Sequence, residues 1–213
     1  MTTEVKICGL STPDALDAAV DAGATHVGLV HFPPSPRHVT LEAATKLRAR
    51  VPDHVQTVVL VVDPDKALLG AIVDTIRPDI LQFHGREAPE AVAASGAQFD
   101  VETWKAVGLG DGAALDRATT YKGSADRLLF DAPPALLPGG NGEPFDWALL
   151  DRADIGMPWG LAGGLTPDNV ARAIQRTGAP LVDVSSGVES APGVKDIALI
   201  RAFCDAARDA RSP

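Results

Sequence analysis

Short apolar segments alternate with amphipathic segments along this 213-residue sequence, and that alternation restricts the possible folds more than any other feature. The apolar segments have the length and the β-branched composition of strands, and helical spacing of apolar residues follows them. Residues 55–62 form a continuous apolar run, which is typical of a parallel strand buried on both faces. The predicted strands are residues 4–10, 25–32, 55–62, 79–83, 99–107, 127–130, 158–162 and 181–184.

Helices are predicted between these strands because the apolar residues recur with a helical period there. Two of them begin with a Thr-Pro-Asp sequence, at residues 12–14 and 166–168, which combines a cap, a proline and an acidic first turn. Three of the predicted helices start at residues 12, 40 and 166. The other five cover residues 65–76, 88–94, 113–121, 145–150 and 196–207.

Eight strand–helix units are the number that closes a parallel sheet on itself. At roughly 25 residues per unit, the chain lies near the lower size limit of such folds and has little room for insertions. No change in composition marks a linker. We therefore predict an α/β fold, a single-domain (β/α)8 TIM barrel over residues 1–213. The alternative is an open doubly wound sheet, which is disfavoured because no G-x-G-x-x-G sequence follows the first strand.

The net charge of −9 and the absence of a local Lys/Arg run argue against binding to nucleic acid or to an anionic membrane. With only Cys8 and Cys204, a disulfide framework is not expected, and Cys204 lies on the apolar face of the last predicted helix. The N-terminal residues lack the pattern of a signal peptide, and no apolar run reaches the roughly 18 residues of a membrane helix. We expect a cytoplasmic protein.

Two side chains at strand ends are candidates for chemistry. Cys8 lies where the first strand hands over to a helix, and the carboxyl ends of parallel strands are where ligands bind in α/β folds. A small buried hydrophobe is the alternative for this cysteine. Asp131 ends the sixth strand, and a carboxylate there must be solvated, paired or functional, with helix capping as the alternative.

Glycine-rich turns follow the last two strands. Gly163-Gly164 and Ser186-Gly187 can both present bare backbone N–H groups, and residues 186–190 are predicted to form a short helix. Barrels commonly bind phosphate between these two loops. Tight turns that need glycine for geometry are the alternative, but the location favours a phosphate site.

Three further side chains are candidate ligand contacts. Arg37 follows a run of prolines that stiffens its loop, so its guanidinium could be held toward a carboxylate or a phosphate; an exposed surface arginine is the alternative. His84 and Asp183 also lie at strand ends, where either could instead satisfy a neighbouring backbone group.

Metal and serine chemistry are not indicated. The five histidines show no paired ligand spacing, and there is no nucleophile elbow. The residues alone therefore predict a barrel that binds a phosphorylated small molecule and has a thiol, a carboxylate and an arginine near its mouth.

The ordered set of short motifs resembles the phosphoribosylanthranilate isomerase family of tryptophan biosynthesis over almost the whole chain. The motifs are Lys6-Ile7-Cys8-Gly9, Pro34-Ser35-Pro36-Arg37, Gln82-Phe83-His84-Gly85, Leu129-Phe130-Asp131-Ala132, Gly139-Gly140-Asn141-Gly142 with Phe145-Asp146-Trp147, Ala162-Gly163-Gly164-Leu165 with Pro167-Asp168-Asn169-Val170, and Asp183-Val184-Ser185-Ser186-Gly187-Val188-Glu189.

The resemblance implies an Amadori rearrangement that needs no cofactor. It implies Cys8 as general base and Asp131 as general acid. It implies that Arg37 contacts the anthranilate part of the substrate, that the glycine turns bind its phosphate, and that Asp183 lies near the substrate, where we also expect His84.

Several alternatives remain open from the sequence. The chain could be another phosphosugar isomerase or epimerase on the same barrel, or a catalytically inactive barrel kept as a phosphate-ligand sensor or an assembly partner. It could be a monomer or a homodimer, and it could accept a second aminoaldose. Residues 132–144, rich in Pro and Gly, are expected to be a functional or a disordered loop.

Overall fold

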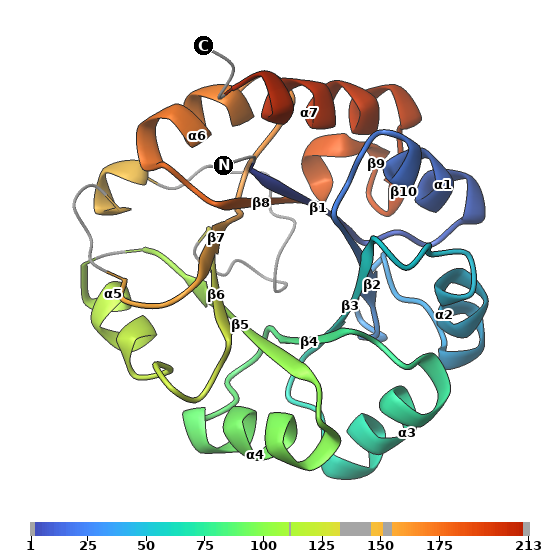
Figure 1. Ribbon diagram of the computed structural model, residues 1–213, viewed down its shortest axis with the longest axis vertical. Helices are drawn as coiled ribbons and strands as arrows, with labels where there is room; N and C mark the ends of the chain where they lie inside the picture. Colours follow the sequence, from blue (N-terminus) through green and yellow to red (C-terminus); the bar gives the residue numbers. More distant parts are fainter. Residues whose placement is uncertain (1–2, 111, 133–145, 151–154, 211–213) are drawn as a thin grey trace.

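The computed structural model describes residues 3–110, 112–132, 146–150 and 155–210 (Figure 1). The expected loop at 132–144, apart from Ala132, lies outside the described residues, as do the motif residues 139–142 and Phe145. Among the described helices, none is both long and apolar enough to cross a membrane.

Eight parallel strands close into a barrel in sequence order, with β1 paired to β8 (Figure 1). This closure confirms the predicted barrel, and the open doubly wound sheet is wrong. The barrel strands are β1 Glu4–Cys8, β2 His26–Val30, β3 Gln56–Val61, β4 Ile80–Phe83, β5 Glu102–Gly108, β6 Arg127–Asp131, β7 Trp159–Leu161 and β8 Leu181–Val184.

The helices surround the barrel as an outer layer (Figure 1). Four of them begin at a side chain that accepts a backbone N–H in their first turn: Thr12, Thr40, Asp65 and Asp196. The described α-helices are α1 Pro13–Asp21, α2 Leu41–Arg48, α3 Lys66–Ile76, α4 Pro89–Phe99, α5 Gly112–Thr119, α6 Val170–Thr177 and α7 Ile197–Asp209, and a 3-10 helix, η1, covers Trp147–Leu150.

The predicted boundaries between α4 and β5 were wrong. The helix predicted at residues 88–94 continues to Phe99, and the strand predicted at 99–107 begins only at Glu102. Phe99 packs against the outer core from the helix, and Asp100 then takes a left-handed conformation with φ 50° that ends it. A single apolar residue at such a junction fits the pattern of either element.

The second Thr-Pro-Asp sequence does not cap a helix directly. The carboxamide oxygen of Asn169 accepts the backbone N–H of Thr166 at 2.8 Å, so residues 166–169 form a turn and α6 begins only at Val170. The first such sequence behaves as predicted, because the Thr12 hydroxyl accepts the N–H of Ala15.

The chain after β8 is more elaborate than predicted. The expected short helix at 186–190 is the 3-10 helix η2, Ser186–Val188. It is followed by an antiparallel ribbon of β9, Glu189–Ala191, and β10, Val194–Lys195 (Figure 1).

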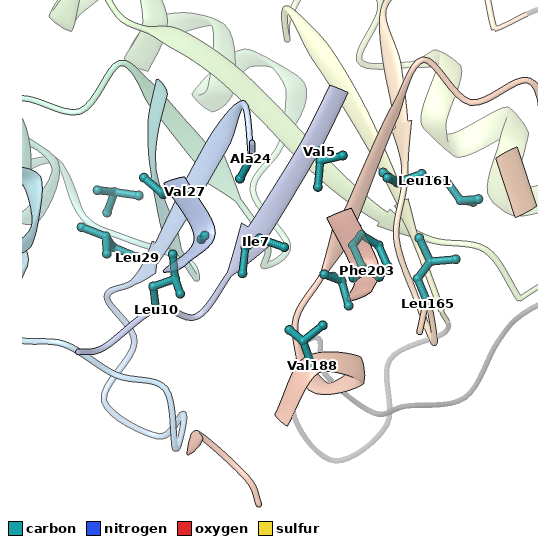
Figure 2. Close-up of a cluster of buried hydrophobic side chains, with 14 of the residues drawn as sticks. Val5, Ile7, Leu10, Ala24, Val27, Leu29, Leu161, Leu165, Val188 and Phe203 are labelled. Atoms are coloured by element: carbon teal, nitrogen blue, oxygen red, sulfur yellow. The ribbon is translucent and has the colours of Figure 1, made fainter. Parts of the chain in front are cut away.

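Alternation along the strands divides the core into an outer and an inner part. The outer core lies between strands and helices, where Val5, Ile7, Val27, Leu29 and Phe203 belong to one buried cluster (Figure 2). The alternate residues of the same strands face the interior. The strand register therefore sends Lys6 and Cys8 inward beside their partners His26 and Gly28.

The interior of the barrel contains an aromatic and charged cluster near the amino-terminal ends of the strands. The rings of His26 and Trp104 are 5.1 Å apart, and the guanidinium of Arg127 lies 4.9 Å above the Trp104 ring. Arg127 also forms an ion pair of 2.6 Å with Glu4. Burial lowers the pKa of His26 from its ordinary 6.5 to about 4, because the charged ring would lose its hydration.

This burial predicts a histidine contribution to acid sensitivity. Above pH 6.5, His26 is neutral in both the folded and the unfolded chain; between pH 6.5 and about 4 only the unfolded chain binds the proton. Stability should therefore fall by up to about 3 kcal/mol as pH drops through that window. Urea unfolding at pH 7 and pH 4.5 should show a smaller fall for His26→Phe than for wild type. The exposed His54→Gln variant should match wild type, and an equal fall in the His26→Phe variant would contradict this account.

Candidate active site

A pocket lies at the carboxyl ends of the strands, and all nine side chains or turns predicted as site residues line it. They come from loops and strand ends far apart in sequence: Cys8, Arg37, His84, Asp131, Gly163, Gly164, Asp183, Ser186 and Gly187. The barrel closure brings them together because every parallel strand ends at the same rim. Their individual roles remain predictions.

Cys8 is the last residue of β1 and is 4% exposed, so it lines the pocket and is also well buried. Val30 and Leu60 pack beside it. Burial raises the pKa of the thiol above its ordinary 9.0, while the ammonium groups of Lys6 and Lys195 oppose the rise. In this pocket the thiol is therefore favoured over the thiolate.

A buried ion pair lies below the thiol. Lys6, two residues before Cys8 on the same inward face, places Nζ 3.0 Å from Oδ2 of Asp183. The Lys6 side chain is fully buried. Burial alone would lower the pKa of Lys6, but the carboxylate of Asp183 raises it above its ordinary value, so Lys6 stays an ammonium.

The other oxygen of Asp183 is available to the pocket. Oδ1 is buried and has no hydrogen-bond partner among the described residues, and Asp183 lines the cavity. Burial raises the pKa of this carboxyl, with Lys6 acting in the opposite direction. Sequence reasoning identified Asp183 but missed Lys6. The missed signal was alternation, since Lys6 shares the face of Cys8.

Asp131 and His84 form a second polar pair at the rim. His84 Nε2 lies 3.3 Å from Asp131 Oδ2, and Asp131 Oδ1 accepts the N–H of Ala132 at 2.8 Å. The other ring nitrogen of His84 lies 3.3 Å from the carboxamide nitrogen of Gln82. Both residues thus contact side chains of the site, and His84 does not merely satisfy a backbone group.

The loop that carries His84 is held by a buried network that sequence reasoning missed. Lys105 Nζ donates to Glu87 Oε2 at 2.9 Å and to the carbonyl of Gly85 at 2.8 Å. Glu87 in turn accepts the N–H groups of Asp63 and Gly85. The loop therefore has little freedom, which keeps the imidazole of His84 beside Asp131.

Arg37 is buried, so the alternative of an exposed surface arginine is wrong. Its guanidinium forms two hydrogen bonds of 2.8 Å with Glu189, from Nε to Oε1 and from Nη2 to Oε2. Glu189 is the first residue of β9 and was noted only as the end of a motif. No local pattern connects it to Arg37, because the two are 152 residues apart.

The two glycine turns pack against each other and against the neighbouring strand end. A Cβ atom on Gly187 would collide with the carbonyl oxygen of Leu165, and one on Gly163 with the backbone nitrogen of Ala132. Gly163 and Gly164 also have left-handed φ values of 78° and 66°. These turns therefore need glycine for their geometry, and they also line the pocket.

The buried pair of Lys6 and Asp183 gives a stability prediction. Lys6→Met leaves the Asp183 carboxylate buried without its partner, which should cost about 3–5 kcal/mol in the free energy of unfolding measured with urea at pH 8. The deficit should shrink toward pH 5, because a proton on Asp183 removes the unpaired charge.

Lys46→Met is the matched control for that measurement. It breaks an exposed pair with Glu42 that water screens, so its free energy of unfolding should stay close to that of wild type. Equal unfolding free energies for the two variants would show that the buried pair contributes nothing to stability.

Comparison with known proteins agrees with this site. The sequence model of the family described as N-(5'phosphoribosyl)anthranilate (PRA) isomerase matches residues 5–206. A protein of Erythrobacter litoralis named N-(5'-phosphoribosyl)anthranilate isomerase is 56% identical over 208 residues, which cover 98% of this chain and 100% of the relative.

Solved structures give the same result. TrpF from Jonesia denitrificans superposes with a TM-score of 0.85 at 42% identity, and the match covers 100% of both chains. A phosphoribosyl anthranilate isomerase solved in complex with reduced 1-(o-carboxyphenylamino)-1-deoxyribulose 5-phosphate has a TM-score of 0.86 at 30% identity, covering 97% of this chain and 98% of the other. The predicted family, fold and isomerase activity are confirmed: the chain belongs to the N-(5'-phosphoribosyl)anthranilate isomerase family, whose members are enzymes of tryptophan biosynthesis.

Proposed function

We propose that this chain carries out the rearrangement of its family with Cys8 as general base and Asp131 as general acid. The substrate is N-(5-phospho-β-D-ribosyl)anthranilate, and the product is 1-(2-carboxyphenylamino)-1-deoxy-D-ribulose 5-phosphate. The observation that carries the proposal is the single pocket that Cys8, Asp131, Arg37 and both glycine turns line together.

The reaction needs one proton donor and one proton acceptor on different atoms of the sugar. A protonated Asp131 donates to the ring oxygen while the anilino nitrogen displaces it, which opens the ring to a Schiff base. Cys8 as thiolate removes the proton at C2′ and gives an enolamine. In the tautomerisation to the ketone, Cys8 gives its proton to C1′ and the Asp131 carboxylate takes the proton of the enol hydroxyl. Both groups are thereby restored, so no external reactant is consumed.

The remaining site residues bind the substrate in this proposal. Arg37 pairs with the carboxylate of the anthranilate ring. The N–H groups of Gly163, Gly164, Ser186 and Gly187 bind the phosphate, while His84 and Asp183 contact the ribose. A relative solved with a phosphorylated deoxyribulose compound supports a ligand of this class.

Cofactor-free catalysis, a cytoplasmic location and a monomeric or homodimeric state stay predictions. Among the described residues, no group of three or more His, Cys, Asp or Glu side chains is arranged to hold a metal ion. The direct test of activity is conversion of the substrate, followed by its anthranilate fluorescence in metal-free buffer.

The thiol must ionise to act as a base, and burial raises its pKa. A raised pKa is opposite to the lowered one that would favour the thiolate at neutral pH. Wild-type activity also depends on the proton of Asp131, so the test uses Asp131→Asn, in which Cys8 alone of the acid–base pair titrates. The proposal predicts that the residual kcat/KM of this variant rises with pH through the neutral range toward pH 9, as the thiolate fraction grows. A residual activity that is flat between pH 6 and pH 9 would count against Cys8 as the base.

Substitution of the acid and the base tests their roles directly. Cys8→Ser and Asp131→Asn should each lower kcat by about 10²-fold or more, because each keeps the shape but loses the proton transfer. Cys204→Ser is the matched control, since Cys204 is the other buried thiol and lies on α7 in the outer core. Near wild-type kcat in Cys8→Ser would exclude the proposed base.

The phosphate site is tested by a pair of glycines with similar backbone conformations. Gly164 has φ 66° and lines the pocket, whereas Gly178 has φ 69° at the end of α6. Valine is strained at both positions. Only Gly164→Val should raise KM and the Ki of inorganic phosphate, by about 10-fold or more, because only that turn contacts the ligand. Equal effects of the two variants would assign the loss to strain.

A further inference from the structure

We propose that Glu189 is a positioning residue for substrate recognition: it holds Arg37 in the one orientation that lets the guanidinium bind the ring carboxylate. The inference rests on the proposed function, because it assumes that Arg37 contacts that carboxylate. It adds a residue that does not contact the substrate and acts through another side chain.

The contact between Glu189 and Arg37 fixes the plane of the guanidinium. Both carboxylate oxygens are used, each at 2.8 Å, and the side chains are only 3% and 10% exposed. Such a bidentate pair allows neither rotation nor tilt of the planar group. Glu189 thereby decides which edge of Arg37 is engaged by the protein.

The end of the guanidinium between Nη1 and Nη2 is left for a ligand. A guanidinium has five N–H donors, of which Glu189 takes one on Nε and one on Nη2. Among the described residues, Nη1 has no hydrogen-bond partner, and Arg37 lines the pocket. Two parallel donors, on Nη1 and Nη2, therefore remain for one carboxylate.

Glu189 is itself held by groups on the ribbon. Lys195 Nζ donates to Oε1 at 2.7 Å, and the N–H of Gly193 donates to Oε2 at 3.1 Å. Burial alone would raise the pKa of Glu189, but the hydrogen bonds and charges of Arg37 and Lys195 hold it below the ordinary value. The carboxylate thus stays charged and immobile.

Lys195 connects this arrangement to the rest of the site. Its ammonium also donates to the carbonyl of Ser185 at 2.8 Å, directly before the glycine turn of Ser186 and Gly187. The hydroxyl of Ser185 donates to the carbonyl of Cys8 at 3.2 Å. The arginine, the turn after β8 and the end of β1 are therefore joined by one chain of contacts.

A purely structural tether is the competing explanation. The ribbon packs on the loop of Arg37, since a Cβ atom on Gly193 would collide with the carbonyl of Pro36. Glu189 could then serve only to fasten ribbon and loop together. The two explanations differ in one respect: a tether affects every ligand equally, whereas a positioning residue affects only ligands that have the carboxylate.

The test compares two inhibitors that differ only in that group. One is reduced 1-(o-carboxyphenylamino)-1-deoxyribulose 5-phosphate, and the other is the same compound without the ring carboxylate. In Glu189→Gln, the Ki of the first should rise about 10-fold, equivalent to about 1.4 kcal/mol, while the Ki of the second should change less than about twofold. Glu42→Gln, which alters an exposed carboxylate on α2, is the control and should change neither.

Glu189→Asp serves as the second variant if Glu189→Gln does not fold. It keeps the charge, but the shorter side chain cannot keep both hydrogen bonds. The Ki of the inhibitor with the ring carboxylate should therefore again rise relative to the Ki of the inhibitor without it. An equal rise of both Ki values, or an unchanged ratio in a folded variant, overturns the inference in favour of the tether.

Wild type and Arg37→Ala separate this inference from the proposed function. If wild type binds both inhibitors equally, or if Arg37→Ala keeps the wild-type ratio, the role of Arg37 is wrong and the inference fails with it. If Arg37→Ala abolishes the preference and Glu189→Gln retains it, only the inference about Glu189 fails.

Discussion

The register between β1 and β8 is the constraint on which the rest of this barrel depends. These strands come from opposite ends of the chain, and their pairing places Lys6 opposite Asp183 inside the barrel. A slip of one residue would turn the side chains of β1 over, which would move Lys6 and Cys8 into the apolar layer beneath the helices. An ammonium buried there without a partner would be costly, so the ion pair penalises the wrong closure.

Several buried charges surround the pocket, and each is paired with an opposite charge. Three buried lysines, Lys6, Lys105 and Lys195, each contact a carboxylate that is also buried. Such pairs add little to stability relative to an apolar core of the same volume. Their benefit lies in geometry, because they fix loops and strand ends around a polar cavity. The ammonium groups of Lys6 and Lys195 lower the pKa of the Cys8 thiol, but burial raises it by more.

The sequence predicted the fold and the rim residues because both depend on local patterns. Strands and helices follow from periodicity, and a residue at the end of a parallel strand must lie at the rim, as Cys8 and Asp131 do. The supporting residues could not be predicted in this way. Glu189 meets Arg37 only after the barrel closes, since the two are 152 residues apart. Alternation along β1 could have placed Lys6 inside the barrel, but not its contact with Asp183, which lies 177 residues away. The boundary at Phe99 failed for another reason: one apolar residue can end a helix or begin a strand.

The ribbon of β9 and β10 limits how the specificity of this barrel can be transferred to another protein. Arg37 belongs to the loop after β2, but the carboxylate that orients it and the lysine that orients this carboxylate belong to the ribbon after β8. A graft of the loop alone would give a host barrel a mobile arginine without its acidic partner. Loops in barrels are often treated as exchangeable modules. Here the smallest exchangeable unit contains the loop after β2, the ribbon after β8, and the paired strands β1 and β8 that lie between them.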